Sequence, residues 1–372
     1  MVAETRVWSP YGAVLESERA ALVAALDAHV DDELIDAAQR RSARLSVRLD
    51  ASPLDDATAD AVDRELLDQG GRSGPWAGGQ RRAEPPEPIG NGDAFGWARA
   101  LKLEGMPTPD IAALEYRGVR EAQMEEDRLA RGFFADPVAT LVEAHRLIAG
   151  GLVSEGRLGA LRSTSRAVTD GAQGMVIFHA PDPARLPRLL EDLDGWLRDA
   201  RDRHAPLAIA GVVHLRLLAW HPFEAGNGRV ARLASRVVLR ATAGDPWGVA
   251  VPEQSYARDP LHYVAEVAAT IRRRSDLAPW IEQTGEAVVA SLEVLARASG
   301  VEPPAVPARG VHECQRLPAG ASITVPEYAA VTECDREAAM MQLNQLCWSG
   351  LLDRDPGTHG LRYVRAKGDG VR

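Results

Sequence analysis

The hydrophobic positions along the chain recur mainly at helical spacing. Glu16 to Arg48 are rich in Ala, Leu, Glu and Arg with apolar residues three or four positions apart, and Asp56 to Leu67 continue that pattern. Ala139 to Ile148 repeat it, and Leu186 to Asp202 place leucines and a tryptophan on one face with acidic residues between them. The chain is therefore expected to be mainly α-helical.

The densest apolar stretch, Pro206 to Trp220, leads into a short polar segment. Its apolar residues lie too close together for a helix with one buried face, so a fully buried helix is expected, opened by Pro206 in its first turn. A second amphipathic pattern starts near Gly228 and continues through Val230, Leu233, Ala234, Val237 and Val238. The segment Trp220 to Arg232 thus joins two core helices.

Stretches rich in Gly and Pro divide the chain. Residues 70–92 cannot hold a regular element, and residues 300–310 have the composition of a linker. We expect a helical N-terminal region over residues 1–130 with a long loop near 70–92, a helical core over 131–299, a linker at 300–310 and a small domain over 311–372. Further helices are expected at residues 93–103, 110–131, 259–274 and 276–297.

The last segment has its own pattern. Ile323 to Ala330 and Asp335 to Ser349 predict two helices, followed by a two-stranded hairpin that turns at Asp355 to Gly360. This order resembles a winged-helix module. A DNA-reading version needs a basic second helix, and here that helix carries Arg336 as its only basic residue, between two acids. We expect protein contact or packing within the chain, with DNA binding disfavoured.

Composition narrows the class of protein. The 372 residues are 45% hydrophobic, enough for sizeable cores, and the net charge of −10 argues against a general nucleic-acid binder. The N-terminus lacks a signal-peptide pattern and there is no run of about 18 apolar residues, so a cytoplasmic protein without a membrane span is expected. The three cysteines, Cys314, Cys334 and Cys347, lack metal-site spacing and are expected to be reduced.

The segment Trp220 to Arg232 carries the candidate chemistry. Gly226, Asn227 and Gly228 can turn successive N–H groups toward an anion at a helix N-terminus, a site that suits phosphate. Arg229 and Arg232 open that helix, where basic side chains oppose the helix dipole unless an anion is bound. His221, just before the turn, can take a proton from a hydroxyl near the phosphate.

The same segment, H-P-F-E-A-G-N-G-R-V-A-R, resembles the signature of Fic-domain proteins, H-P-F-x-[DE]-G-N-G-R-x-x-R. The resemblance implies a Fic helical core and the transfer of a nucleotide monophosphate, usually AMP from ATP, to a Ser, Thr or Tyr hydroxyl of a target protein, with Mg²⁺ on the phosphates. It assigns His221 as the general base, the backbone of residues 226–228 as the anion hole, and Arg229 and Arg232 as phosphate ligands.

One position departs from the signature. Ala225 stands where the family has the acid that holds magnesium, and the nearest carboxylate is Glu224, one place earlier. Magnesium is commonly held by one or two carboxylates plus substrate phosphates. Three outcomes are open: Glu224 binds the metal instead, the nucleotide alone carries it, or catalysis is weakened or lost. The alternatives to a transferase are an inactive Fic scaffold that binds a nucleotide or a partner, and a transcription regulator using the C-terminal module.

Two further features of the family have counterparts here. Gly174 to Ala180 is a short β-prone run that resembles the flap, a hairpin that aligns the target backbone by strand addition, with Met175, Val176, Ile177 and Phe178 as its residues. The winged-helix module is itself a frequent appendage of Fic proteins. A homo-oligomer formed by the helical domain is also compatible with the sequence.

Many Fic proteins carry an inhibitory helix with the pattern [ST]-x-x-x-E-[GN], whose glutamate pairs with the second signature arginine. Near Leu101 to Met106, Glu104 is followed by a glycine, but an alanine stands where Ser or Thr belongs. Ser46 to Ala51 offers the serine and an acid, Asp50, without the Glu or the Gly. We rank Glu104 slightly ahead of Asp50 as an inhibitory acid.

Overall fold

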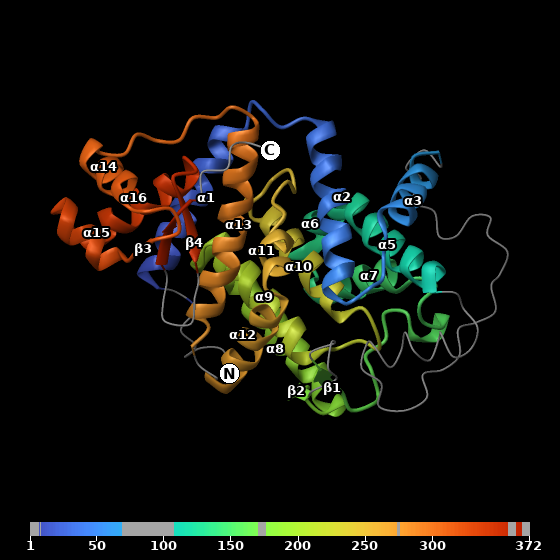
Figure 1. Cartoon of the computed structure of the whole chain (residues 1–372). Coiled ribbons are helices and arrows are strands. Elements are labelled where there is room, and N and C mark those ends of the chain that lie inside the picture. Colours follow the sequence, from blue (N-terminus) through green and yellow to red (C-terminus); the bar gives the residue numbers. More distant parts are fainter. Residues whose placement is uncertain are drawn as a thin grey trace.

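The computed structural model describes residues 7, 9–68, 108–169, 176–273, 276–355 and 362–366. Within these ranges the chain is mainly helical, with two small sheets (Figure 1), as the sequence predicts. The expected loop at 70–92 and helix at 93–103 lie outside the described residues.

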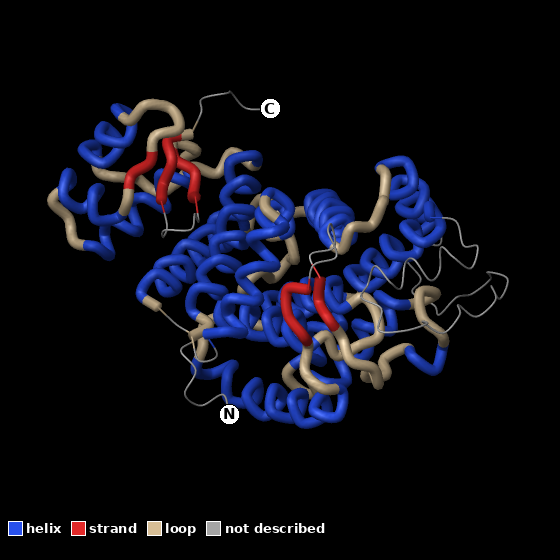
Figure 2. Tube along the Cα trace, turned by 60° about the horizontal axis from the view of Figure 1, so that its bottom comes forward, coloured by secondary structure: helices blue, strands red, loops and turns tan. Residues whose placement is uncertain are grey.

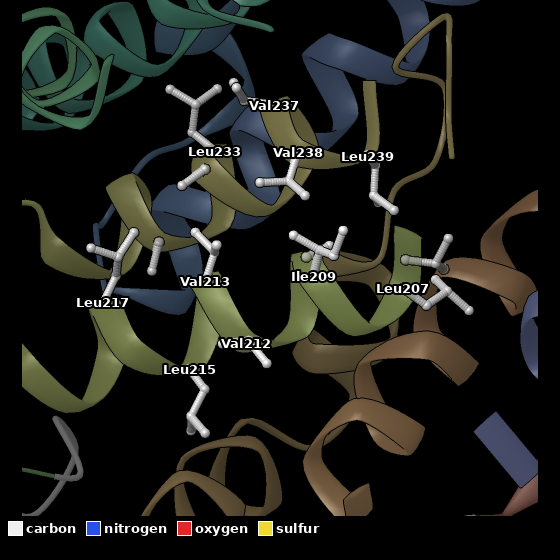
Figure 3. Packing of buried hydrophobic residues seen from close by; sticks show 14 of the residues in the cluster. Leu207, Ile209, Val212, Val213, Leu215, Leu217, Leu233, Val237, Val238 and Leu239 are labelled. Atoms are coloured by element: carbon white, nitrogen blue, oxygen red, sulfur yellow. The ribbon is translucent and has the colours of Figure 1, made fainter. Parts of the chain in front are cut away.

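Helices α9 (Pro206–Trp220) and α10 (Asn227–Ala241) form the centre of the core. Their apolar side chains meet along the whole length of the pair, as Figure 3 shows for Ile209 and Val213 of α9 and Val238 of α10. Each fully buried aliphatic side chain contributes about 1.5–3 kcal/mol relative to an exposed one. The loop between these helices is therefore anchored at both ends in well-packed structure.

The other helices surround this pair. They are α1 (Pro10–Leu26), α2 (Asp32–Leu49), α3 (Asp56–Asp68), α5 (Thr108–Met124), α6 (Glu126–Phe133), α7 (Pro137–Ala149), α8 (Leu186–Arg203), α11 (Glu253–Arg258), α12 (Pro260–Arg273) and α13 (Ala278–Ala298), with short 3₁₀ turns at Glu155–Arg157 and Pro183–Arg185. The helix expected at 110–131 is split into α5 and α6. Local sequence fixes several starts, since Asp31 and Asp136 accept hydrogen bonds from first-turn N–H groups of α2 and α7.

A two-stranded hairpin lies against this helical body (Figure 2). Strand β1 (Ala167–Thr169) pairs antiparallel with β2 (Val176–His179), and Val168 faces Phe178 in the register. The hairpin occupies the place of the expected flap, although Met175 lies outside the described residues. Helix α12 packs against β2 and closes the space between the hairpin and α9.

The C-terminal segment forms α14 (Ala308–Arg316), β3 (Ser322–Ile323), α15 (Val325–Thr332), α16 (Arg336–Trp348), β4 (Leu352–Asp355) and β5 (Arg362–Arg365), with sheet order β3-β5-β4. Two expectations need correction. Ile323 lies in a strand and not in a helix, because Thr324 and Glu327 form a capping box that starts α15 after Thr324. The extended linker ends at Pro307, since α14 already begins at Ala308.

This segment packs on α1 and α13, at the end of the molecule away from α3 and α5 (Figure 1). Arg354 of β4 donates two hydrogen bonds to the Glu293 carboxylate of α13, at 2.9 and 2.8 Å, and both side chains are buried. A buried charge pair of this kind strongly disfavours separation, because either partner alone would be left buried and uncompensated.

The other composition-based expectations can also be compared with the structure. The three cysteines are free thiols. Among the described helices, none is both long and apolar enough to cross a membrane.

Candidate functional site

His221 ends α9 in a strained backbone conformation that aims its ring. Its φ of 43° and ψ of 62° lie in the left-handed region, which costs a non-glycine residue about 1–2 kcal/mol. Two hydrogen bonds hold His221 there. The His221 N–H donates to the Leu217 carbonyl, and Arg162 Nε donates to the His221 carbonyl at 2.7 Å. Nδ1 lies 2.5 Å from the Leu218 carbonyl, which only a protonated Nδ1 can satisfy. Nε2 is therefore the nitrogen that accepts a proton.

The surroundings of His221 keep its imidazole neutral. The pKa of His221 is lowered to about 4, chiefly by burial and also by the nearby Arg166 and Arg162, against the raising effects of the Leu218 carbonyl and Asp50. A neutral imidazole at physiological pH is the form that can act as a general base.

The loop after His221 is shaped by the side chain of Asn227. Its Oδ1 accepts from the Phe223 N–H and its Nδ2 donates to the Phe223 carbonyl, both at 2.9 Å. Gly226 caps α10 with a φ of 71°, a conformation that glycine adopts without strain. The first N–H groups of α10 have no partners within the helix and form an anion site at its positive end.

Both signature arginines are buried at this helix end. Arg232 Nη2 donates to Asp50 Oδ1 at 2.7 Å, and Arg229 Nε lies 3.2 Å from Asp50 Oδ2. Arg229 also lies 3.4 Å from Glu115 of α5, and its Nη1 is buried without a hydrogen-bond partner in the described part of the chain. The two guanidiniums therefore converge on one carboxylate, and Arg229 keeps donor capacity for a further anion.

Asp50 comes from the C-terminal end of α2, far away in the sequence. Ser46, one turn earlier, accepts from Arg232 through its hydroxyl at 2.8 Å and through its carbonyl at 2.7 Å. The Asp50 carboxylate also lies on the anion site itself, since a Cβ built on Gly228 would be 2.5 Å from Oδ1. Asp50, ranked second from the sequence, is thus the acid that meets Arg232, whereas Glu104 lies outside the described residues.

These groups open onto a cavity of about 420 Å³. His221, Gly226, Gly228 and Arg232 form its polar end. The opposite wall is apolar and comes from the hairpin, α9 and α12, through Val168, Phe178, Leu218, Leu261, Val264 and Val267. A cavity with one anion-binding end and one apolar end fits a small molecule that joins phosphate to a flat ring.

The residues present do not fit a magnesium ion held by the protein. Ala225 is buried in a small apolar cluster with Ile111 and Leu152. The Glu224 carboxylate, the predicted metal ligand, lies between two guanidiniums instead, 3.8 Å from Arg157 and 4.0 Å from Arg166. Among the described residues no group of three or more His, Cys, Asp or Glu side chains could hold a metal ion.

Two more histidines lie near the site. His145 of α7 stacks on Phe223 at 4.2 Å and accepts from the Gly159 N–H, so it supports the loop from beneath. His214 hydrogen-bonds to Tyr263 at 2.7 Å and is fully buried. The sequence identified neither His145 nor Arg166 as part of the site, because each acts through contacts with loop residues that are distant along the chain.

The chain resembles known proteins in sequence and in fold. The described part of the chain is a helical protein in which a buried histidine and two arginines meet at the N-terminus of one helix. Residues 137–239, which run from α7 into α10, match the model of the Fic/DOC family. The chain therefore contains a Fic domain over these residues.

Relatives with curated names are distant. The chain is 25% identical over 219 residues to the protein adenylyltransferase fic-1 of Caenorhabditis elegans, covering 55% of this chain and 38% of that protein. It is 28% identical over 163 residues to the protein adenylyltransferase Fic of Nematostella vectensis, covering 42% of this chain and 36% of the relative. The matched part thus spans less than two fifths of either relative.

A solved structure resembles the chain over nearly its whole length. The crystal structure of a Fic family protein from Desulfovibrio desulfuricans G20 superposes with a TM-score of 0.57 at 19% identity, covering 98% of both chains. This likeness concerns the fold, including the N-terminal helices and the C-terminal segment.

Proposed function

We propose that this protein transfers AMP from ATP to a hydroxyl side chain of a target protein. The family match and the names of the curated relatives support a nucleotidyltransferase. The position of Asp50 carries the proposal, because its carboxylate marks a place where an anion contacts Gly228, Arg229 and Arg232 together. A phosphate group in that place would make the same contacts.

The chemistry follows from the groups around this anion position. His221 Nε2 takes the proton of the target hydroxyl, whose oxygen then forms a bond to the α-phosphorus of ATP. The bond from that phosphorus to the bridging oxygen breaks, and pyrophosphate leaves with the bonding electrons. Arg229, Arg232 and the N–H groups of the α10 N-terminus stabilise the charge on the phosphates. The apolar wall of the cavity would hold the nucleoside.

The hairpin is proposed to position the target. Phe178 of β2 lies edge-on to His221, with 6.3 Å between ring centroids, so the hairpin borders the base directly. Val176 at the start of β2 is 53% exposed, which leaves an apolar contact for an incoming chain. A target segment paired with this hairpin would bring its hydroxyl close to His221.

Asp50 is proposed to inhibit the enzyme. With its carboxylate over Gly228 and bound to Arg232, a phosphate cannot occupy the same place. Ser46 and Asp50 follow the spacing of the family's inhibitory pattern, with Asp replacing Glu and Ala51 replacing Gly. Ala51 has a φ of 58°, the conformation that the Gly or Asn of the pattern would adopt readily.

Isotope labelling tests the reaction. The purified protein is incubated with ATP labelled on the α-phosphate or, in a parallel sample, on the γ-phosphate, and the label bound covalently to protein is counted. AMP transfer places only the α label on protein, and the His221→Ala variant should place none. Label from the γ-phosphate alone would contradict the proposal, and the absence of both labels in the Asp50→Ala variant would favour an inactive scaffold.

Inhibition by Asp50 has its own test. Asp50→Ala should raise the rate of α-label transfer by about tenfold or more, which corresponds to about 1.4 kcal/mol. Asp32→Ala, at the other end of α2, removes an exposed carboxylate from the same helix and should leave the rate unchanged. Equal rates for both variants would show that Asp50 does not control the site.

The C-terminal segment is proposed to be a winged-helix module that serves the fold and not DNA. Its order of helices and strands supports the winged-helix interpretation. The Arg354 guanidinium on β4 is directed into the core, where Glu293 binds it, and is not presented to a phosphate backbone. The transcription-regulator alternative predicts salt-dependent binding of the whole chain to duplex DNA, and we expect none at low salt.

A further inference from the structure

Position 225 presents an apolar wall in place of a metal ligand. Ala225 is 5% exposed and belongs to the cluster of Ile111, Ala149, Leu152 and Val153. Transfer of AMP still needs positive charge close to the breaking bond between the α- and β-phosphates. Because no carboxylate at position 225 can bind a metal ion, another group in the cavity must supply this positive charge.

Arg166 is such a group. It stands directly before β1, is only 5% exposed, and lines the same cavity as His221 and Gly226. Its Nη2 donates to the backbone carbonyl of Glu224 at 2.6 Å, which fixes the guanidinium beside the signature loop. Its influence on the pKa of His221, second to burial among the lowering effects, reflects the same proximity.

Several charged side chains lie around Arg166. Glu224 is the carboxylate next to it, at 4.0 Å, and the same carboxylate faces Arg157 at 3.8 Å. Arg162, which also lies near His221, donates to the backbone carbonyls of His221 and of Pro181, which follows β2. Among the charged side chains that line the cavity, three arginines (Arg48, Arg166 and Arg232) outnumber two acids (Asp50 and Glu224), a balance that favours a polyphosphate.

We propose that Arg166 is a catalytic residue whose guanidinium binds the phosphates of ATP at the site, so that nucleotide binding does not depend on a magnesium ion held by the protein. The inference rests on the proposed function. In the transfer step Arg166 stays protonated and neutralises the charge that pyrophosphate gains as the bond from the α-phosphorus to the bridging oxygen breaks. A planar guanidinium suits this task because it can contact two phosphate oxygens at once.

Calorimetric titration with ATP tests the inference, in the full chain carrying Asp50→Ala so that the anion position is open. The affinity for ATP should agree within about threefold between buffer with Mg²⁺ and buffer with EDTA. Adding Arg166→Ala should weaken binding in EDTA by about tenfold or more, and Arg166→Lys should recover part of the loss. Strict dependence on Mg²⁺, or unchanged affinity in Arg166→Ala, would overturn the inference.

Arg157→Ala is the matched control. Arg157 also faces the Glu224 carboxylate but does not line the cavity, so its removal should leave the affinity within about twofold. An equal loss in Arg157→Ala and Arg166→Ala would assign the effect to the loop's shape and overturn a direct role. Thermal unfolding of each variant checks that the fold is retained.

The inference and the proposed function fail in different ways. If ATP binds in EDTA through Arg166 but the α label never reaches protein, the inference stands and AMP transfer fails. If α-label transfer needs Mg²⁺ and survives in Arg166→Ala, AMP transfer stands and the inference fails.

Discussion

At the residue scale, His221 combines a fixed direction with a fixed charge state. The hydrogen bond from Nδ1 to Leu218 leaves Nε2 to accept a proton, and burial keeps the ring neutral. The sequence gives no indication of this pKa, because it depends first on burial of the ring in the folded chain and then on side chains that the fold brings near, such as Arg166 and Arg162. The signature motif was enough to propose His221 as the base, whereas its lowered pKa could be derived only from the structure.

The lowered pKa of His221 predicts an unusual pH profile. The base stays unprotonated as pH falls until pH approaches about 4, whereas an ordinary histidine protonates near 6.5. The rate of α-label transfer by Asp50→Ala should therefore be flat from about pH 5.5 to 8. This variant also leaves the anion position open to ATP. A loss of rate with a midpoint near pH 6.5 would contradict the assignment of the pKa.

Gly228 is predicted to be irreplaceable because a side chain there would fill the anion position. An alanine Cβ would lie 2.5 Å from Asp50 Oδ1 and 3.1 Å from Arg232 Nη1. With Asp50→Ala as background, Gly228→Ala should still weaken ATP binding by about tenfold or more, measured by calorimetry. Gly195→Ala in α8 is the control, since no atom lies within 4 Å of its Cβ. That control should keep the affinity and gain about 1 kcal/mol of stability.

At the element scale, the site is assembled by helix ends. The N-terminus of α10 supplies the anion site, the C-terminus of α9 supplies the base, and the C-terminus of α2 supplies Asp50. Periodicity predicted α9 and α3 nearly to the residue, and the start of α10 within one residue. It did not predict which end of α2 approaches α10, because that depends on how α2 packs on α5 and α11. For this reason the sequence ranked Asp50 behind Glu104, although Asp50 is the acid that meets Arg232.

The end of α2 stores strain that a glycine would relieve. Ala51 has a φ of 58°, in a region that costs alanine about 1–2 kcal/mol. Ala51→Gly should therefore leave the free energy of unfolding unchanged or raise it by up to about 1 kcal/mol. Ala21→Gly, at an exposed position inside α1, should lower it by about 1 kcal/mol. Urea denaturation compares the two, and an equal loss in both variants would contradict the strain at Ala51.

At the scale of the whole molecule, the C-terminal segment is tied to the core through buried polar groups. Arg297 of α13 donates to the carbonyl of Cys347 at 2.7 Å, next to the pair formed by Arg354 and Glu293. Glu18 of α1 and Glu286 of α13 lie close to this pair, and burial raises the pKa of each carboxyl to about 7. The sequence predicts a separate module with balanced charge. It could not predict that Arg354 pairs with Glu293, because the two residues are 61 positions apart and no local pattern links them.

The raised pKa of Glu286 predicts how stability depends on pH. Between the unfolded value of 4.5 and about 7 the folded state holds a proton that the unfolded chain lacks, so this contribution is lost as pH rises through 7. Glu286→Gln, which cannot lose that proton, should raise the free energy of unfolding at pH 8 by about 1–3 kcal/mol and have little effect at pH 5. Exposed Glu302→Gln should change neither value. Urea denaturation at both pH values measures the difference, and a gain from Glu286→Gln of the same size at pH 5 would contradict the titration.

Intact-mass spectrometry of the Asp50→Ala variant after incubation with ATP tests the central claim most directly. The claim is that His221 promotes AMP transfer from the anion site that Asp50 otherwise fills. A mass increase of one AMP group is expected on Asp50→Ala, acting on a hydroxyl of its own chain, and none on the variant that also carries His221→Ala. Unchanged mass in both variants, or the same increase in both, would contradict it.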